Sequence, residues 1–338
     1  MKRNWLKVAS IYVGTVIGAG FASGREIIQF FGVYGLKGII GISISGILFS
    51  LIGGLLLLKV YNNKVIGFDD LVNRIFGKRL KKVLDLIMIF SLYTGFSVMV
   101  AGSGAIFREE LGFSFNYGMM VMVTLSYIVF LFDLEGLSFV NSILVPLLIL
   151  GIIFTGLYLS IGGGLSLSAI GELNPASKTN FLVSSLLYVG SNSLIIIIVF
   201  SSLLPIINSK KTAISGGLVG GLILYILGLS ILLTMLMYYG EVIYTDVPML
   251  KIASYISDGY RKFYAIILWC AIFTTAIANG SGFINRFANS KYKMLIGVLF
   301  CISSLPLAKM GFSRLVGLIY PIFGFIGFII LVFILVVL

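Results

Sequence analysis

The sequence predicts an all-α integral membrane protein in which ten spanning helices form a 5+5 inverted repeat, with discontinuous helices at the first and sixth positions. Three observations predict this class. Hydrophobic residues make up 59% of the chain and charged residues only 11%, whereas soluble domains are about half apolar and a quarter charged. Apolar windows of about 20 residues, the length that crosses a hydrocarbon core, recur along the sequence. The two halves of the chain also match each other at a nearly constant spacing.

Each predicted span corresponds to one apolar window. The windows lie at Trp5–Phe31, Leu36–Val60, Val83–Phe107, Phe115–Phe132, Phe139–Ser160, Phe181–Ile207, Thr212–Tyr238, Lys262–Gly282, Met294–Ala308 and Phe312–Leu338. We expect one membrane domain over residues 1–338, with repeats at approximately 5–160 and 181–338.

Orientation in the membrane explains the net charge of +12 better than nucleic-acid binding does. The basic residues sit in short loops, above all between the second and third spans, and not on a polar domain. Cytoplasmic loops of membrane proteins carry an excess of Lys and Arg. The sequence therefore predicts a cytoplasmic N-terminus, and an even number of spans places the C-terminus on the same side.

The second half of the chain repeats the first in reversed orientation. Matching residues lie 175 or 176 positions apart, namely Tyr12–Thr15 with Tyr188–Ser191 and Pro146 with Pro321. Amphipathic stretches also follow the second span of each half, at Phe68–Phe76 and Val247–Ile256. Because each half holds an odd number of spans, the second copy enters the bilayer from the opposite side. Such repeats are typical of alternating-access transporters, whose solute site lies where discontinuous helices meet.

The first span is predicted to break near its centre. Gly14, Gly18, Gly20 and Gly24 lie close together, and a glycine inside a helix costs about 1 kcal/mol relative to alanine. Unwinding frees carbonyl groups that can bind a cation and amide groups that can bind a carboxylate. In hydrocarbon, such groups are tolerated only where they face protein, ligand or ions. The alternative is close helix packing through these small residues.

A second break is expected in the sixth span, at the symmetry-related segment Gly190–Ser193. The serine hydroxyls and the asparagine amide of this segment can satisfy an interrupted backbone or the polar end of a ligand.

The eighth span carries small and polar residues along one helix face: Ala271, Thr274, Thr275, Ala278, Asn279 and Gly282. Paired hydroxyls beside free carbonyls make a neutral oxygen cage that suits a monovalent cation. The alternative is that both threonines bond back to carbonyls one turn earlier, which is common in membrane helices.

The run from Gly14 to Glu26, Gly-Thr-Val-Ile-Gly-Ala-Gly-Phe-Ala-Ser-Gly-Arg-Glu, resembles the first helix of the YkvI family of bacterial membrane proteins. That family is a branch of the amino acid-polyamine-organocation (APC) superfamily. The resemblance covers the chain in helix count and order. It implies the leucine-transporter (LeuT-type) fold, a multi-pass location in the bacterial inner membrane, and secondary active transport with no cofactor besides a coupling ion.

In sodium-coupled members of this superfamily, one Na⁺ lies between carbonyls of helix 1 and an Ala-x-x-Thr-Ser/Thr pattern in helix 8. The resemblance therefore implies a Na⁺ site formed by Gly14, Ile17, Ala271, Thr274 and Thr275. Some proton-coupled members instead carry a lysine in helix 5. The fifth span contains no lysine, which favours symport with sodium over the proton-coupled alternative.

The resemblance also implies a small amino acid or related zwitterion as substrate. Its carboxylate is expected on the amides of Gly18 and Gly20, and its amino group on carbonyls of helices 1 and 6. Tyr93 is a candidate carboxylate partner or, alternatively, a packed aromatic. The implied substrate-binding residues are Thr15, Gly18, Ala19, Gly20, Tyr93, Val189, Gly190, Ser191 and Asn192.

Arg25 and Glu26 form an adjacent charge pair about 8 Å beyond the break in the first span. Charges at that depth are costly unless they face water or a partner. We expect the pair to gate the outer vestibule or to carry a proton.

A receptor is the alternative from a different functional class, since spore-germination sensor subunits of this superfamily bind amino acids without transporting them. An enzyme is not expected, because the chain has no histidine and no cysteine or carboxylate cluster at catalytic spacing. Cys270 and Cys301 each lie in an apolar span, so neither a disulfide nor a metal site is expected. The predicted partners are a small solute and the lipid bilayer.

Overall fold

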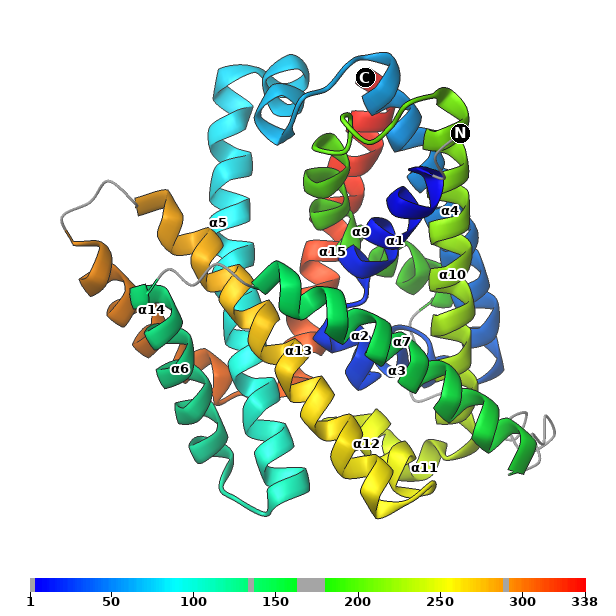
Figure 1. Ribbon diagram of the computed structural model, residues 1–338, viewed down its shortest axis with the longest axis vertical. Coiled ribbons are helices and arrows are strands. Elements are labelled where there is room, and N and C mark those ends of the chain that lie inside the picture. The colour runs from blue at the N-terminus through cyan, green and yellow to red at the C-terminus, as the bar shows by residue number, and fades with distance from the viewer. Residues whose placement is uncertain (1–3, 133–136, 163–179, 288–291) are drawn as a thin grey trace.

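The computed structural model describes residues 4–132, 137–162, 180–287 and 292–338, and all regular secondary structure in them is helical (Figure 1). Within these described residues, seven helices are long and apolar enough to cross a membrane: Leu36–Asn62, Leu80–Leu111, Ile143–Ile161, Phe181–Ser201, Lys210–Met237, Asp258–Phe287 and Phe312–Val337. Two shorter apolar helices span Phe115–Leu131 and Lys293–Ala308. The prediction of an all-α, multi-pass membrane protein is confirmed.

The helices occur in the predicted order. The first half contains α1 (Asn4–Val16), α2 (Ala19–Ser23), α3 (Arg25–Phe30), η1 (Gly32–Tyr34), α4 (Leu36–Asn62), α5 (Phe68–Leu111), α6 (Phe115–Phe132) and α7 (Leu137–Gly162). The second half contains α9 (Phe181–Ser201), α10 (Lys210–Met237), α11 (Tyr239–Val242), α12 (Pro248–Ser254), α13 (Asp258–Ile284), η2 (Asn285–Phe287), α14 (Lys293–Ala308) and α15 (Phe312–Val337).

The long helices pack as two groups that face each other (Figure 1). Helices α1 and α4 each contact both α9 and α10, and these four form the first group, whereas α5, α6, α13 and α14 form the second. Helix α15 contacts α9 and α5, and helix α7 contacts α10 and α13, so both helices bridge the groups. The space between the groups is therefore bordered by helices from both halves of the chain.

Glycines allow α4 and α10 to touch backbone to backbone. A Cβ atom at Gly217 would lie 2.2 Å from the amide nitrogen of Gly54, and one at Gly221 would lie 2.3 Å from that of Ser50. In a bilayer, small residues permit this close approach and the dispersion contacts that come with it. The close packing of α4 against α10 therefore depends on glycines, which have no side chain.

The predicted break in the first span is present. Helix α1 ends at Val16, and Gly18 is extended, with φ −101° and ψ −176°, before α2 begins. The Gly18 amide donates to the Val16 carbonyl at 2.9 Å instead of continuing the helical ladder to Gly14. A second interruption follows at Gly24, whose φ of +78° lies in the left-handed region that glycine adopts without strain. The span is thus divided into α1, α2 and α3.

The predicted break at Gly190–Ser193 is wrong, because α9 is continuous from Phe181 to Ser201. A Cβ atom at Gly190 would lie 1.9 Å from the carbonyl oxygen of Gly324 in α15. The glycine therefore serves close packing between two helices, which is the alternative to unwinding.

The polar side chains beside Gly190 bond back to their own helix. The Ser191 hydroxyl donates to the Tyr188 carbonyl at 2.8 Å, and the Ser193 hydroxyl donates to the Val189 carbonyl at 2.7 Å. The Asn192 amide also donates to the Tyr188 carbonyl, at 3.1 Å. These hydrogen bonds satisfy the polar groups without freeing any backbone, so the sequence pattern does not require a break.

Both predicted amphipathic segments contain short helices. Gly77, with φ +64° and ψ 179°, separates Phe68–Phe76 from the membrane-spanning part of α5. The corresponding segment of the second half forms α12, whose apolar residues are buried.

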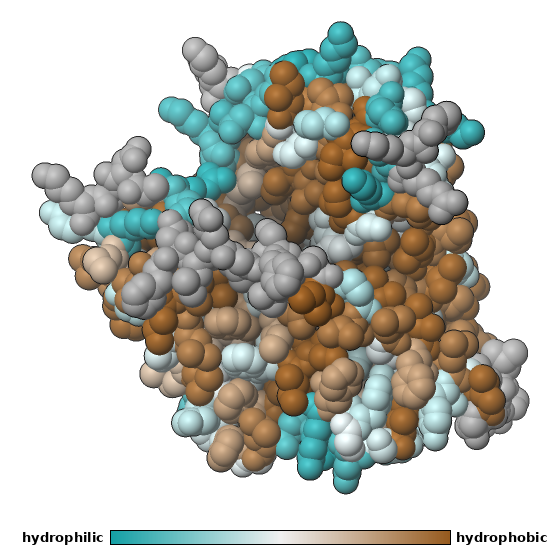
Figure 2. Space-filling view, in the orientation of Figure 1, coloured by the Kyte–Doolittle hydropathy of each residue, from teal (hydrophilic) through white to brown (hydrophobic). Residues whose placement is uncertain are grey.

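The two ends of the described chain lie on the same face of the molecule (Figure 1). The Asn63 side chain donates to the Leu338 carbonyl at 3.1 Å, and the Asn4 side chain donates to the Ile206 carbonyl at 3.0 Å. Figure 2 shows hydrophilic residues gathered at this end, above a largely hydrophobic middle. We call this end the terminal face and the opposite end, with α11 and α12, the α12 face.

Candidate functional site

A cavity of about 360 Å³ lies between the two helix groups, beside the break in the first span. Its walls are formed by the segment from Gly14 to Gly20 together with residues of α3, α5, α7, α9, α13 and α15. The lining follows α9 as far as Val199, close to the helix end on the terminal face. Toward the α12 face it ends at Glu26 and Ile319. The cavity therefore extends toward the terminal face.

The structure brings together all five residues of the implied Na⁺ site. Gly14 and Ile17 line the cavity from the broken span, and Ala271, Thr274 and Thr275 line it from α13. The hydroxyls of Thr274 and Thr275 donate to the Ala271 carbonyl at 3.1 and 2.8 Å. Their oxygens keep lone pairs that a cation can use. This geometry is compatible with a cation site, and cation binding itself stays a prediction.

Six of the nine implied substrate-binding residues line the same cavity: Thr15, Gly18, Ala19, Gly20, Ser191 and Asn192. The other three are absent from its wall. Tyr93 donates to the Ser303 carbonyl of α14 at 2.7 Å and packs against Phe300. Val189 is buried in the core, and Gly190 packs against α15.

Arg25 and Glu26 point to different surroundings. The Arg25 guanidinium donates to the carbonyls of Ile243 and Thr245 at 3.0 and 3.1 Å, in the segment between α11 and α12. Glu26 lines the cavity and is only 6% exposed. Its carboxyl group accepts a hydrogen bond from the Tyr320 hydroxyl of α15. The two adjacent charges therefore serve two different sites.

The Glu26 carboxyl group lies directly against α2. A Cβ atom added at Gly20 would lie 1.9 Å from Oε1 of Glu26, so a larger residue there would displace this carboxyl group. The carboxyl group is thus held beside the broken segment, within the wall that a bound solute would contact.

Asp246 links two helices, α5 and α15, on the α12 face. Its carboxylate accepts hydrogen bonds from the Ser313 hydroxyl and amide at 2.5 and 3.1 Å and pairs with Arg108 at 2.5 Å. Its own amide donates to the Glu109 carboxylate at 2.8 Å. Together with the contacts of Arg25, these bonds hold residues 243–246 against α3, α5 and α15 and close this face. We call this set of contacts the Asp246 latch.

We expect Asp246→Asn to lower stability, because the amide loses the ionic contact with Arg108 and cannot match all the donors around it. The expected loss is about 1–3 kcal/mol in the free energy of unfolding, measured by thermal unfolding in detergent. Asp85→Asn is the control, since the Asp85 side chain, paired with Arg286 at 3.3 Å, is 39% exposed whereas that of Asp246 is 13% exposed. A loss for Asp246→Asn no larger than that of the control would contradict the latch.

Sequence reasoning missed several residues of the cavity wall, among them Ser91 and Thr94 of α5 and Tyr320 of α15. One signal pointed to Tyr320, because it precedes Pro321, which matches Pro146 in the internal repeat. Nothing in the pattern of α5 distinguished Ser91 and Thr94 from other small residues.

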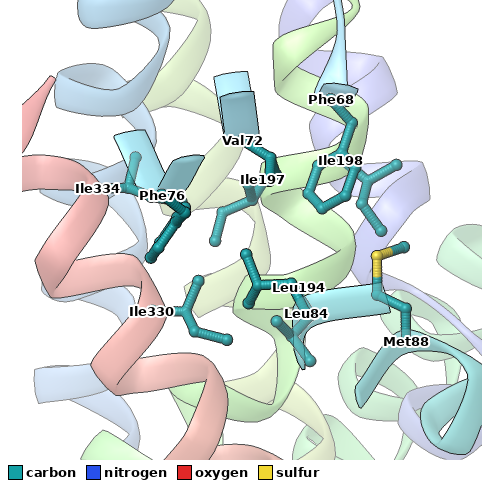
Figure 3. A pocket seen from close by; sticks show the side chains of 10 residues that line it. All are labelled: Phe68, Val72, Phe76, Leu84, Met88, Leu194, Ile197, Ile198, Ile330 and Ile334. Atoms are coloured by element: carbon teal, nitrogen blue, oxygen red, sulfur yellow. The ribbon is translucent and has the colours of Figure 1, made fainter. Parts of the chain in front are cut away.

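A second hollow, of about 10 Å³, lies where Phe68–Phe76 packs against α9 and α15. Figure 3 shows that hydrocarbon and thioether side chains surround it, including Phe76, Leu194 and Ile330. With no polar lining group to hold even one water molecule, it is a packing gap.

Comparison with known proteins agrees with this geometry. No family model matches the chain. The membrane protein YkvI of Bacillus subtilis (strain 168) is 31% identical over 95% of this chain and 92% of its own length. The protein YyaD of the same organism is 26% identical over 98% of this chain and 96% of its own length.

Solved structures share the fold at low sequence identity. The inward-facing conformation of Mhp1 matches with a TM-score of 0.60 and 13% identity, over 95% of this chain and 72% of that one. Mhp1 in a closed conformation with bromovinylhydantoin bound has a TM-score of 0.50 and 12% identity, over 95% and 73%. A mutant manganese transporter of Eremococcus coleocola has a TM-score of 0.50 and 15% identity, over 97% and 84%. The chain is a membrane protein with the LeuT-type transporter fold, and it belongs to the family of Bacillus subtilis YkvI.

Proposed function

We propose that the protein is a secondary active transporter that couples Na⁺ to symport of a small amino acid or related zwitterion by alternating access. One observation carries this proposal. The broken first span and the Ala271–Thr275 segment of α13 face a common cavity that extends toward one face and is latched on the other. Carbonyls freed at a break and neutral hydroxyl oxygens are ligands suited to a monovalent cation.

We further propose ten membrane crossings in a 5+5 inverted repeat. The segments α1, α2 and α3 together make the first crossing, and the nine other apolar helices make the rest. The helical segment before Gly77 and helix α12 occupy equivalent places in the two halves. The common face of the two chain ends is compatible with an even number of crossings.

The terminal face is proposed to be cytoplasmic in a bacterial inner membrane, so that the cavity faces inward. Basic residues at the end of α4 and in the first part of α5, among them Lys59, Arg74 and Lys81, support this orientation. The similarity is also higher to inward-facing Mhp1 than to its closed form, with TM-scores of 0.60 and 0.50. In this state, solute and Na⁺ leave to the cytoplasm while the Asp246 latch keeps the outer face shut. Opening outward requires the latch to break and the terminal face to close.

The test is uptake of radiolabelled amino acids, assayed as a mixture and then singly, into proteoliposomes. We expect accumulation that requires an inward Na⁺ gradient and stays low when K⁺ replaces Na⁺. Uptake that is independent of Na⁺ but follows an imposed pH gradient would indicate that the transporter is coupled to protons and not to sodium. The cavity position of Glu26 favours this as the second candidate. Saturable binding with no uptake under either gradient would indicate a sensor.

A further inference from the structure

The polar wall of the cavity is dominated by hydrogen-bond acceptors. Hydroxyls of Thr15, Thr94 and Ser191 donate to backbone carbonyls of their own helices at 2.7–2.8 Å. Thr274 and Thr275 donate in the same way to the Ala271 carbonyl. A hydroxyl has one proton to donate, so each of these groups can only accept from a ligand.

The asparagine of α9 has the same bias. Nδ2 of Asn192 donates to the Tyr188 carbonyl at 3.1 Å and contacts the Ser191 hydroxyl oxygen at 3.4 Å. Both of its protons are therefore used, and Oδ1 remains to face a ligand. These six polar side chains of the wall thus offer lone pairs and no protons, which suits a solute rich in N–H donors.

Glu26 adds an ionisable carboxyl group to this wall. It is the only Asp, Glu, Lys or Arg residue among those that line the cavity. The neighbouring cation, Arg25, is directed away to the carbonyls of Ile243 and Thr245. No ion pair of Glu26 occurs among the described residues, and the neutral Tyr320 hydroxyl donates a hydrogen bond to it. A carboxylate buried in this way lacks the opposite charge that makes burial favourable.

We propose that Glu26 binds the protonated amine of the solute, and that the surrounding acceptor oxygens receive its remaining N–H groups. This inference rests on the proposed transport function and names the chemical group that the site selects. It also supplies a partner for the amino group in place of the carbonyls that the unbroken α9 does not free. The resemblance implied that carbonyls of both helices 1 and 6 hold the amino group, but the backbone of α9 stays within its helix at Val189–Ser191.

The test compares probes that share one branched four-carbon group and differ in the polar groups attached to it. Isobutylamine carries only the amine, L-valine adds a carboxylate, isovalerate has only the carboxylate, and isobutanol is neutral. Each is titrated against thermal unfolding of the purified full chain in detergent with Na⁺ present. We expect isobutylamine, L-valine or both to stabilise the wild type, and isovalerate and isobutanol to leave it unchanged. Stabilisation by isobutylamine identifies a simple amine as sufficient, and stabilisation by L-valine alone identifies the amino acid.

Glu26→Gln keeps the shape of the side chain and removes its charge, and is expected to weaken amine binding at least about tenfold. Asp85→Asn, at an exposed ion pair outside the cavity wall, should bind as the wild type does. Gel filtration checks that both variants are folded. If Glu26→Gln does not fold, the comparison of the four probes on the wild type still tests the inference. Equal affinity of wild type and Glu26→Gln, equal stabilisation by isovalerate, or no stabilisation by either amine overturns the inference. Glu26-dependent binding without gradient-driven uptake would overturn the transport proposal and leave this inference in place.

Discussion

Replacing Gly221 with alanine should destabilise the protein, and replacing it with leucine should prevent folding. The alanine Cβ would lie 2.3 Å from the Ser50 amide nitrogen and 2.4 Å from its Cα. Because both atoms are backbone, α4 and α10 must separate along their contact. Alanine gains about 1 kcal/mol in helix propensity, whereas overpacking costs about 1–3 kcal/mol, and the rigid backbone favours the upper end. Thermal unfolding in detergent measures the alanine variant, and the yield of monodisperse protein measures the leucine variant.

Gly259→Ala is the matched control for Gly221→Ala. Gly259 lies in the first turn of α13, and a Cβ atom there would meet nothing within 4 Å. The propensity gain then acts alone, so the control should be neutral or slightly stabilised. If both alanine variants unfold at or above the wild-type temperature, the close backbone contact between α4 and α10 is incorrect.

Replacing Thr274 and Thr275 together by valine should abolish the sodium requirement or raise the half-maximal Na⁺ concentration at least about tenfold. Valine keeps the branched shape and removes both hydroxyl oxygens, and interactions of charged groups with such oxygens contribute about 1.5–3 kcal/mol each. The measurement is uptake into proteoliposomes as a function of Na⁺ concentration at fixed solute concentration.

Thr234→Val controls for the loss of a buried threonine hydroxyl. Thr234 lies in α10, is 1% exposed and donates to carbonyls of its own helix, as Thr274 does. It does not line the cavity. Its sodium dependence should match that of the wild type. An unchanged dependence of uptake on Na⁺ concentration in the double variant would show that the Thr274 and Thr275 hydroxyls do not bind the coupling ion.

Apolar length and glycine content were sufficient to predict the helices and the break at Gly18. Both signals are local. A membrane span needs about 20 apolar residues, and closely spaced glycines weaken the helix at their own position. The same local pattern failed at Gly190, because whether a glycine unwinds or packs depends on the helix opposite. The carbonyl of Gly324, 134 residues further along the chain, decides that outcome.

The candidate site was predictable only where one helix face carries it. The spacing of Ala271, Thr274 and Thr275 placed three residues on one cavity wall. The different partners of Arg25 and Glu26 could not be predicted, because both partners lie in the second half of the chain. Tyr320 belongs to the site through the same long-range packing.

The uninterrupted α9 affects how the molecule can change shape. Its backbone meets that of α15 at Gly190 and Gly324, and again where a Cβ atom at Gly327 would lie 2.2 Å from the Gly190 carbonyl oxygen. Two helices in such close backbone contact cannot slide or bend independently. Helix α15 should therefore move with the first group as part of one rigid body. The two helix groups should then move relative to each other at the contact between α15 and α5. The hinge for this movement should lie at Gly18 and Gly24 in the first crossing.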